Sequence, residues 1–237
     1  MITGIVVALP EEISTLTTQK IGKGCCVFIA PDILLVRSGT GPRNARTAAE
    51  LALARGAARL VSWGCAAALV ETLAPGDLTV VDSLISDQFE RLHIQSSWLT
   101  ETRNILSGLR PCTAGCLAES GTVVSSAADK KNIHSRTQAT VLDMESVAIA
   151  KVARQNNIPF LAIRAIADPA TMDLPESVIR SLNSDGEVVL PRLLAHLAGH
   201  PAELAGLIKL GLHFKAAQKT LKRVAQHLDP ITHFSQV

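Results

Sequence analysis

Two carboxylic residues, Glu145 and Asp168, stand where paired carboxylates could perform acid–base chemistry. Glu145 begins a predicted helix, after an apolar segment that ends at Leu142 and after Asp143, whose carboxylate can cap that helix. Asp168 ends the apolar segment Phe160–Ala167, which is typical of a parallel strand covered on both faces. Open α/β sheets bind their ligands at the carboxyl ends of strands. We therefore expect both carboxylates to face one cleft, in separate roles.

The surrounding segments alternate between strands and helices, which predicts an α/β domain with a mostly parallel sheet. We expect strands at residues 4–9, 25–29, 33–37, 59–63, 78–81, 119–125 and 160–167. We expect helices at residues 44–55, 97–109, 144–155, 191–198 and 201–228. The stretch with Lys130, Lys131 and His134 has no clear pattern and is predicted to be irregular. Acidic or Gly-rich turns should share one sheet edge: Glu11-Glu12, Gly39-Thr40-Gly41, Gly64-Cys65-Ala66 and Asp168.

Composition places the chain among single-domain globular proteins. Its 237 residues are 47% hydrophobic and 19% charged, which is enough for a large core and too apolar for disorder. Aromatic residues make up 3% of the chain, with no Tyr, so few rings could stack on nucleobases. The formal net charge of +2 is too small for wide phosphate neutralisation. Both features argue against a nucleic-acid-binding protein.

The cysteines and the N-terminal sequence indicate in which cellular compartment the protein is expected. Five cysteines without a regular framework predict reduced thiols in a cytosolic protein: Cys25, Cys26, Cys65, Cys112 and Cys116. No Cys/His set completes a zinc site, so we expect no metal. The N-terminus lacks a basic leader with a long apolar core, and no apolar run is long enough to span a bilayer. We therefore expect a cytoplasmic protein.

The C-terminal part differs in character from the rest. We divide the chain into a domain of residues 1–190 and a helical extension of residues 191–237 that packs on it. The longer helix of the extension carries an apolar stripe with its basic residues mainly to the side: Leu204, Leu207, Ile208, Gly211, Phe214, Ala217, Leu221, Val224 and Leu228. Such a stripe packs on its own domain, on a partner subunit or on a membrane surface. We favour packing on protein, and peripheral contact with the inner face of the membrane is the alternative.

Four segments in order resemble the nucleoside phosphorylase and nucleosidase superfamily. They are GIVVALPEE (4–12), SGTGPRNA (38–45), WGCAAALVETLAPGDLTVVD (63–82) and LDMESVAIAKVARQNNIPFLAIRAIAD (142–168). In general form the chain looks like the branch that cleaves methylthioadenosine and S-adenosylhomocysteine. Beyond residue 168 it resembles a narrower group, the hopanoid-associated phosphorylases of bacteria. That likeness lies in Pro169-Ala170, Leu174-Pro175, Asp185-Gly186 and the basic C-terminal helix.

The resemblance implies a three-layer α/β sandwich with a mixed, mostly parallel sheet, and a homo-oligomeric enzyme without a cofactor. Its reaction would be cleavage of an N-glycosidic bond, with inorganic phosphate as co-substrate if the reaction is phosphorolysis. We expect release of adenine from a 5′-substituted adenosine, namely adenosylhopane in hopanoid biosynthesis. The alternative substrates are methylthioadenosine, S-adenosylhomocysteine or purine nucleosides in general. A non-catalytic nucleoside-binding protein or membrane-surface scaffold is a second alternative.

The resemblance also assigns roles to single residues. Asp168 matches the Asp that protonates purine N7, a role that requires a raised pKa. Glu145 matches the Glu that holds the ribose hydroxyls, and Met144 would lie beneath the ribose. Glu12 falls where nucleosidases carry the Glu that activates water, although a one-residue shift would give this role to Glu11.

Further residues complete the expected substrate pocket. Cys65, Ala66 and Ala67 occupy the place of a Ser-Ala-Gly type loop, and the thiol of Cys65 is a poor hydrogen-bond donor. Val123 and Val124 stand near a position that is aromatic in the methylthioadenosine branch, which predicts a wider pocket. Arg164 lies inside an apolar strand, so it needs a buried partner, which we expect to be Glu145 or another carboxylate.

The nucleophile stays open between water and phosphate. The backbone of Gly39, Thr40 and Gly41 could bind an anion, and Arg43 follows that turn. The full set of phosphate-binding Arg residues found in well-known purine phosphorylases has no counterpart in this sequence.

Overall fold

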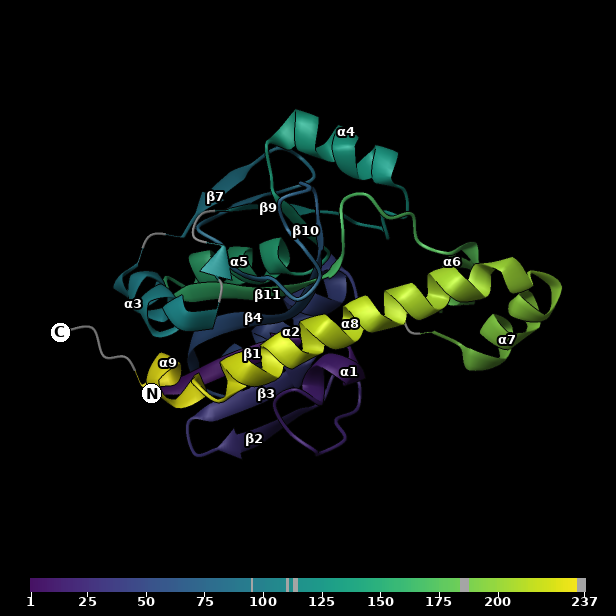
Figure 1. Ribbon diagram of the computed structural model, residues 1–237. Coiled ribbons are helices and arrows are strands. Elements are labelled where there is room, and N and C mark those ends of the chain that lie inside the picture. The colour runs from purple at the N-terminus through teal and green to yellow at the C-terminus, as the bar shows by residue number, and fades with distance from the viewer. Residues whose placement is uncertain (95, 110, 113–114, 184–187, 234–237) are drawn as a thin grey trace.

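The computed structural model describes residues 1–94, 96–109, 111–112, 115–183 and 188–233, with only the backbone of 111–112 (Figure 1). Its strands form one mixed sheet. They are β1 (Ile2–Val7), β2 (Cys26–Ala30), β3 (Ile33–Arg37), β4 (Ala57–Ala68), β5 (Leu78–Val80), β6 (Ser83–Ile85), β7 (Arg91–His93), β8 (Pro111–Cys112), β9 (Cys116–Glu119), β10 (Val141–Asp143) and β11 (Phe160–Asp168).

The helices lie mainly between these strands and at the C-terminus. They are α1 (Pro10–Ile13), α2 (Pro42–Ala54), α3 (Ser97–Ile105), α4 (Ala127–Thr137), α5 (Ser146–Gln155), α6 (Glu176–Ser181), α7 (Leu190–Gly199), α8 (Leu204–Ala225) and α9 (Leu228–Thr232). Two short 3-10 turns, η1 (Ser107–Leu109) and η2 (Pro201–Glu203), complete the list of helical elements in the described residues.

The sheet branches at β4, its longest strand. The main path runs β2-β3-β1-β4-β10-β9-β6-β7, while β11 pairs with β4 and β5. The first part of β4 pairs in parallel with β1 and β11, and its last residues, Ala67 and Ala68, pair antiparallel with β10. The carboxyl ends of β1, β3, β4 and β11 therefore approach one edge, as predicted from the acidic and Gly-rich turns.

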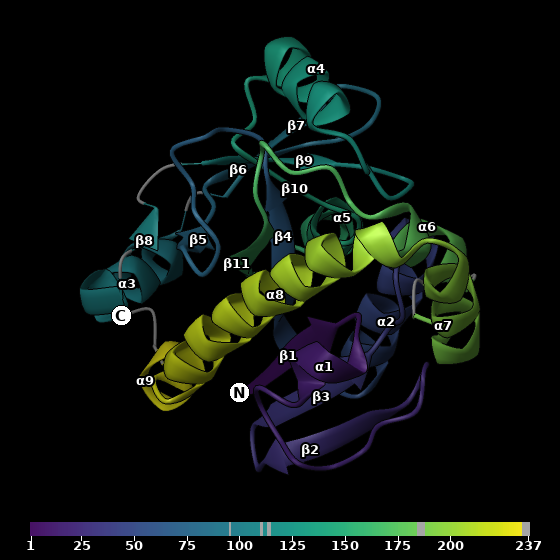
Figure 2. The same cartoon turned by 45° about the vertical axis from the view of Figure 1, so that its right-hand side comes forward.

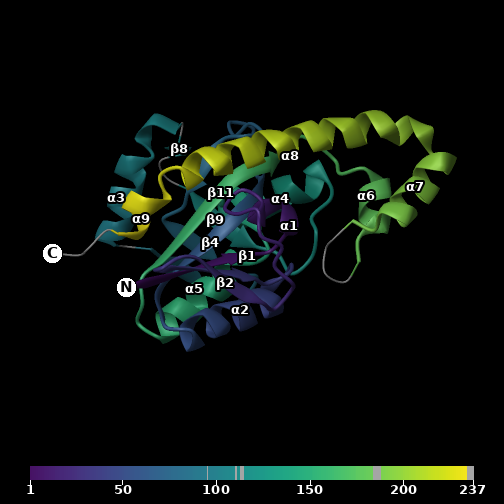
Figure 3. The same ribbon diagram turned by 90° about the horizontal axis from the view of Figure 1, so that it is seen from below.

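The architecture is a three-layer α/β sandwich, as expected. α2 and α5 cover one face of the sheet and α8 crosses the other (Figure 3). The strand interiors are almost wholly apolar and buried, and β11 is buried from Phe160 to Ala167. α4 lies at the end of the molecule beside β9 and β7 (Figure 2).

α8 is bound to the sheet through its second half. Ala217, Leu221 and Val224 are fully buried, and α8 packs along β11. Thr220 Oγ1 donates to the carbonyl of Gly76 at 2.6 Å, and Gln218 Nε2 donates to the carbonyl of Glu11 at 2.9 Å. The second contact ties α8 to α1, the helix that carries Glu12.

Four predictions of local structure were wrong. The turn predicted at Glu11-Glu12 is instead the short helix α1, which begins at Pro10. The turn predicted at Gly64-Cys65-Ala66 is instead part of β4, because β11 pairs with these residues. The strand predicted at 119–125 instead ends at Glu119. The stretch with Lys130 is the helix α4, where Ser126 accepts from the N–H of Asp129 as a cap. Its apolar pattern is weak, because its buried residues are Lys130 and Thr137.

We expect Leu221→Ala to lower the free energy of unfolding by about 2–5 kcal/mol, because the change leaves a cavity between α8 and β11. Leu212→Ala on the same helix is the matched control, since Leu212 is 60% exposed. Its effect should stay within about 0.5 kcal/mol. Urea unfolding of both variants measures the two values. Equal effects would contradict the packing of α8 on the sheet.

Candidate active site

The strands bring acidic residues from distant parts of the sequence to one edge of the sheet. α1 after β1 supplies Glu12, the segment after β10 supplies Glu145, and Asp168 is the last residue of β11. The turn after β3 supplies Gly41, and the end of β4 supplies Cys65. Hydrogen bonds between these segments, described below, hold them in place.

Glu12 is buried and bound to the backbone of two segments. Its Oε1 accepts from the N–H of Cys65 at 2.7 Å, and its Oε2 accepts from the N–H of Leu9 at 3.0 Å. Burial raises the pKa of Glu12 above its usual range, and Arg164 offsets part of this effect. A Cβ at Gly64 would lie 2.5 Å from both Glu12 Oε1 and Arg164 Nη1, so only glycine fits between them. Glu11 is exposed.

Arg164 is the buried cation of this edge. Its Nη2 forms an ion pair with Asp143 at 2.6 Å and donates to the hydroxyl of Ser62 at 2.6 Å. Nε and Nη2 also donate to the hydroxyl of Ser146. Asp143 Oδ1 accepts from the N–H groups of Glu145 and Ser146 at the start of α5, as predicted, although the N-cap residue itself is Glu145. The partner of Arg164 is thus Asp143, and Glu145 acts on it only at longer range.

Glu145 combines burial with nearby negative charge. Its Oε1 accepts from the N–H of Gly41 at 2.9 Å, and its Oε2 accepts from the N–H of Met144 at 3.3 Å. Burial and the carboxylate of Asp143 raise the pKa of Glu145 from 4.5 to about 7, although Arg164 lowers it in part. Glu145 therefore exchanges a proton near neutral pH.

Asp168 belongs to a second charged group. Its Oδ1 lies 2.6 Å from Nζ of Lys130, whose side chain is completely buried. Burial raises the pKa of Asp168, as predicted for an acid at an apolar strand end, and Lys130 offsets part of the rise. The pairing with β4 shifts by one residue between Ile166 and Asp168. This irregularity interrupts the alternation that would place Asp168 on the strand face of Arg164.

The loop expected to contact substrate is part of a strand. Ala66 is buried, Ala67 pairs with both Leu142 and Asp168, and Cys65 donates its N–H to Glu12. Burial, and then the charge of Glu12, raise the pKa of the Cys65 thiol well above its usual range. Val124 is half-buried and, like Ala67, packs against a small apolar cluster that contains Leu69 and Leu142. Cys65 therefore contributes an uncharged thiol and an amide that is already bound.

The four residues predicted to bind phosphate have different surroundings in the structure. Gly41 has φ +91°, which favours glycine, and its N–H donates to Glu145. Among the described residues, the N–H groups of Gly39 and Thr40 have no acceptor. Arg43 is exposed and lines a cavity together with other residues of α2 and α5 and with Glu119 at the end of β9. These four residues stay a proposed anion site, and the structure gives Gly41 a different hydrogen-bond partner.

The phosphorylase superfamily model matches residues 3–189 of this chain. The chain belongs to that superfamily. Its overall fold is similar to that of a Helicobacter pylori methylthioadenosine nucleosidase mutant holding 5′-methylthioadenosine, with a TM-score of 0.70 at 18% identity, covering 97% of each chain. An S-adenosylhomocysteine nucleosidase from Streptococcus pyogenes gives 0.70 at 17% identity, covering 97% of each chain. A futalosine hydrolase of Helicobacter pylori gives 0.69 at 18% identity, covering 97% of this chain and 96% of the other.

Membership in the phosphorylase superfamily confirms the resemblance noted in the sequence, and it makes the protein an enzyme of the phosphorylase or nucleosidase type. It supports cleavage of the N-glycosidic bond of a nucleoside, and it is consistent with a reaction that needs no cofactor. Phosphate as a co-substrate is equally consistent with this superfamily. The described residues contain no group of three or more potential metal ligands from His, Cys, Asp and Glu.

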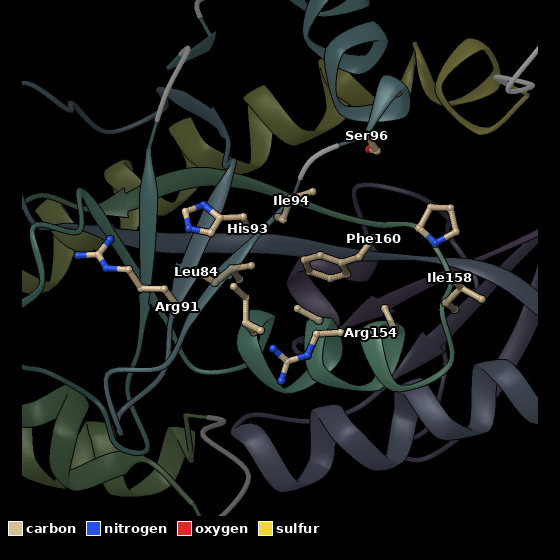
Figure 4. Close-up of a pocket in the computed structure, with 12 residues that line it drawn as sticks. Leu84, Arg91, His93, Ile94, Ser96, Arg154, Ile158 and Phe160 are labelled. Atoms are coloured by element: carbon tan, nitrogen blue, oxygen red, sulfur yellow. The ribbon is translucent and has the colours of Figure 1, made fainter.

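Two cavities, of about 270 and 290 Å³, have linings that do not include Glu12, Glu145 or Asp168. The first is lined by His93, Ile158 and Phe160 among others (Figure 4). Phe160 begins β11 and Asp168 ends it, which separates them by roughly 26 Å along the strand. The second cavity is the one beside Arg43. The candidate site is therefore defined by the charged groups at the sheet edge.

Several polar side chains of the candidate site were not predicted from the sequence. Ser62 and Ser146 bind Arg164, and Lys130 binds Asp168, yet none was predicted to take part. Ser62 lies in an apolar strand segment and Lys130 in a predicted irregular stretch, so neither carried a local signal. The two residues Asp185-Gly186 of the narrower resemblance lie outside the described residues.

We expect Glu145→Gln to weaken the pH dependence of stability. A carboxyl whose folded-state pKa is raised keeps its proton in the folded state while the unfolded state releases it, so stability falls as pH rises from about 4.5 through about 7. Removing this carboxyl group should reduce the difference in free energy of unfolding between pH 5 and pH 8 by about 2 kcal/mol. Urea unfolding at both pH values measures it.

The control for this test is Glu50→Gln, because Glu50 is a half-exposed residue of α2. That variant should keep the wild-type pH dependence. A Glu145→Gln protein that loses as much stability between pH 5 and pH 8 as the wild type would contradict the buried, partly protonated state of Glu145.

Proposed function

We propose that this enzyme releases adenine from a 5′-substituted adenosine, with Asp168 as the general acid. The observation that carries the proposal is the position of the Asp168 carboxyl group at the end of β11, paired with Ala67 at the edge where the buried Glu12 and Glu145 lie. Burial raises the pKa of Asp168, which suits a group that donates a proton. Cleavage of an N-glycosidic bond needs a proton for the leaving base and negative charge near the sugar. Separate carboxyl groups can supply both.

In the proposed mechanism Asp168 donates its proton to N7 of the purine as the bond to the sugar breaks. Glu145 binds the ribose hydroxyls, for which it exchanges its present partners, the N–H groups of Gly41 and Met144. Its charge then offsets the positive charge that develops on the sugar. Met144 is half-buried next to it and provides an apolar surface below the ribose.

The proposed role of Glu12 is to activate the nucleophile. A buried carboxyl with a raised pKa is a suitable base for a bound water molecule. The alternative nucleophile, phosphate, would lie on the free N–H groups of Gly39 and Thr40. One assay with and without inorganic phosphate, separating free ribose products from ribose 1-phosphate products, decides between hydrolysis and phosphorolysis.

The proposed substrate is adenosylhopane, whose 5′ substituent is large and aliphatic. The half-buried Val124 near an expected aromatic position and the resemblance to hopanoid-associated phosphorylases support it. Turnover of adenosylhopane and of methylthioadenosine should be compared in one series. Fast turnover of methylthioadenosine with none of adenosylhopane would reject this substrate and favour the methylthioadenosine alternative.

We expect Asp168→Asn to lower kcat/KM by about 10²–10⁴, because an amide cannot donate the proton that the base needs. Adenine release measured by chromatography gives the value. Asp229→Asn is the control, since the Asp229 side chain is 86% exposed. An Asp168→Asn enzyme with wild-type activity would remove the acid role.

The same proposal places the protein in the cytoplasm, in contact with the inner face of the membrane through α8. Leu204, Ile208 and Leu212 follow each other at four-residue spacing and are 50–60% exposed. Lys215 and Lys219 are exposed and continue that stripe. Residues 204–228 contain five Lys and Arg residues and no acidic residue, which suits an anionic lipid surface. No helix among the described residues is long and apolar enough to cross a membrane.

We expect the protein to float with vesicles that contain phosphatidylglycerol and not with pure phosphatidylcholine vesicles. The double variant Ile208→Asn, Leu212→Asn should lose this binding because it removes the apolar contact, and high salt should weaken it. Phe28→Asn is the matched control, because Phe28 is 45% exposed on β2, outside α8. Flotation that survives in the double variant would exclude this surface.

The proposal also includes a homo-oligomer and the division into residues 1–190 and 191–237. The superfamily match ends at residue 189, which supports that boundary. Phe89 and Val123 are 47% and 41% exposed, in the segments after β6 and β9, and a second copy could cover them. Sedimentation equilibrium measures the state of association.

A further inference from the structure

Lys130 is a completely buried lysine on α4 whose ammonium group has an acceptor for each of its three protons. Nζ donates to Asp168 Oδ1 at 2.6 Å, to the carbonyl of Met172 at 2.8 Å and to the carbonyl of Pro169 at 3.0 Å. A buried ammonium is costly unless it is paired and fully hydrogen-bonded, and this one meets both conditions. The ammonium group of Lys130 is therefore a fixed cation at the end of β11.

Two further hydrogen bonds fix α4 against the segment after β11. The N–H of Ala127 donates to Asp173 Oδ1 at 2.7 Å, and the N–H of Leu174 donates to the carbonyl of Ser125 at 2.7 Å. Lys130 therefore reaches Asp168 from a helix that is itself bound to the chain on the far side of Asp168. This arrangement leaves the carboxyl group of Asp168 little freedom to rotate.

The two oxygens of Asp168 have different surroundings. Oδ1 is held by Lys130, while Oδ2 has no hydrogen-bond partner among the described residues. The charged groups that act on Asp168 are Lys130 from α4 and Asp173 from the following segment, and β4 presents the uncharged Ala67 beside it. Oδ2 is thus the oxygen available to carry a proton to a ligand.

We propose that Lys130 is a positioning residue for the acid step: it holds Oδ1 of Asp168 so that Oδ2 faces the leaving base. This inference rests on the proposed function of Asp168. The proton passes from Oδ2 to the purine nitrogen, and the electron pair of the N-glycosidic bond leaves with the base. Lys130 keeps its own protons, and its charge balances the carboxylate that forms.

The expected effect of Lys130→Met is a fall in kcat of about 100-fold with little change in KM, because binding of the ribose is separate from proton delivery. The pH profile should change as well. Asp168 must be protonated to act, so activity is lost as pH rises through its pKa. Removing the cation that lowers this pKa should move the basic limb of the profile to higher pH.

Lys131→Met is the matched control, since Lys131 is the next residue of α4 and is exposed. It should leave kcat, KM and the pH profile unchanged. Lys130→Met with a wild-type kcat and an unmoved basic limb would overturn the inference. A wild-type enzyme that releases no base from any nucleoside would instead reject the proposed function, before Lys130 is considered.

Lys130→Met alone could fail to fold, because removing one partner of a buried ion pair is strongly destabilising. A second variant therefore provides an independent test. The double variant Lys130→Met, Asp168→Asn carries no unpaired charge. Since Lys130 acts only through Asp168, the residual activity of the double variant should equal that of Asp168→Asn alone. A further loss of tenfold or more in the double variant would contradict a role through Asp168.

Discussion

The buried guanidinium of Arg164 is the interaction on which the candidate site depends. It joins β11 to β4 through Ser62 and to the start of α5 through Asp143 and Ser146. Without this cation, the carboxylates that gather at the sheet edge would repel each other in a medium of low polarity. The strand end and the helix start that carry the candidate residues are thus fixed by one charged side chain.

Three buried carboxyl groups, of Glu12, Asp143 and Glu145, face this single guanidinium. Asp143 forms the direct ion pair with Arg164. In the part of the chain that the structure describes, Glu12 and Glu145 lack such a direct pair, and burial raises their pKa values. Asp168 forms its ion pair with a different cation, Lys130. The separation of the two charged groups allows the acid at β11 and the carboxylates near the ribose position to hold different protonation states at one pH.

The C-terminal helix has two unlike halves. The second half is part of the fold, because Ala217, Leu221 and Val224 are buried on the sheet and Gln218 binds the carbonyl of Glu11. The first half, with α7, extends beyond the sheet and exposes leucines (Figure 1). The stripe predicted as one continuous packing surface therefore divides, and only the part over β11 has its expected partner.

The sequence by itself determined the α/β class, the strand that ends at Asp168, the binding of Asp143 to N–H groups at the start of α5 and the superfamily, because apolar periodicity, helix-start signals and family motifs are local properties of the chain. It could not assign the partner of Arg164, the helix around Lys130 or the inclusion of Gly64 in β4, since each depends on residues more than 20 positions away. The register shift after Ile166 is the clearest case. Regular alternation would place Asp168 on the face of Arg164, but pairing with β4 interrupts that alternation, and Asp168 binds Lys130 instead. Only the tertiary structure decided which cation serves which carboxylate, because ion pairs form between strands and helices that the fold brings together.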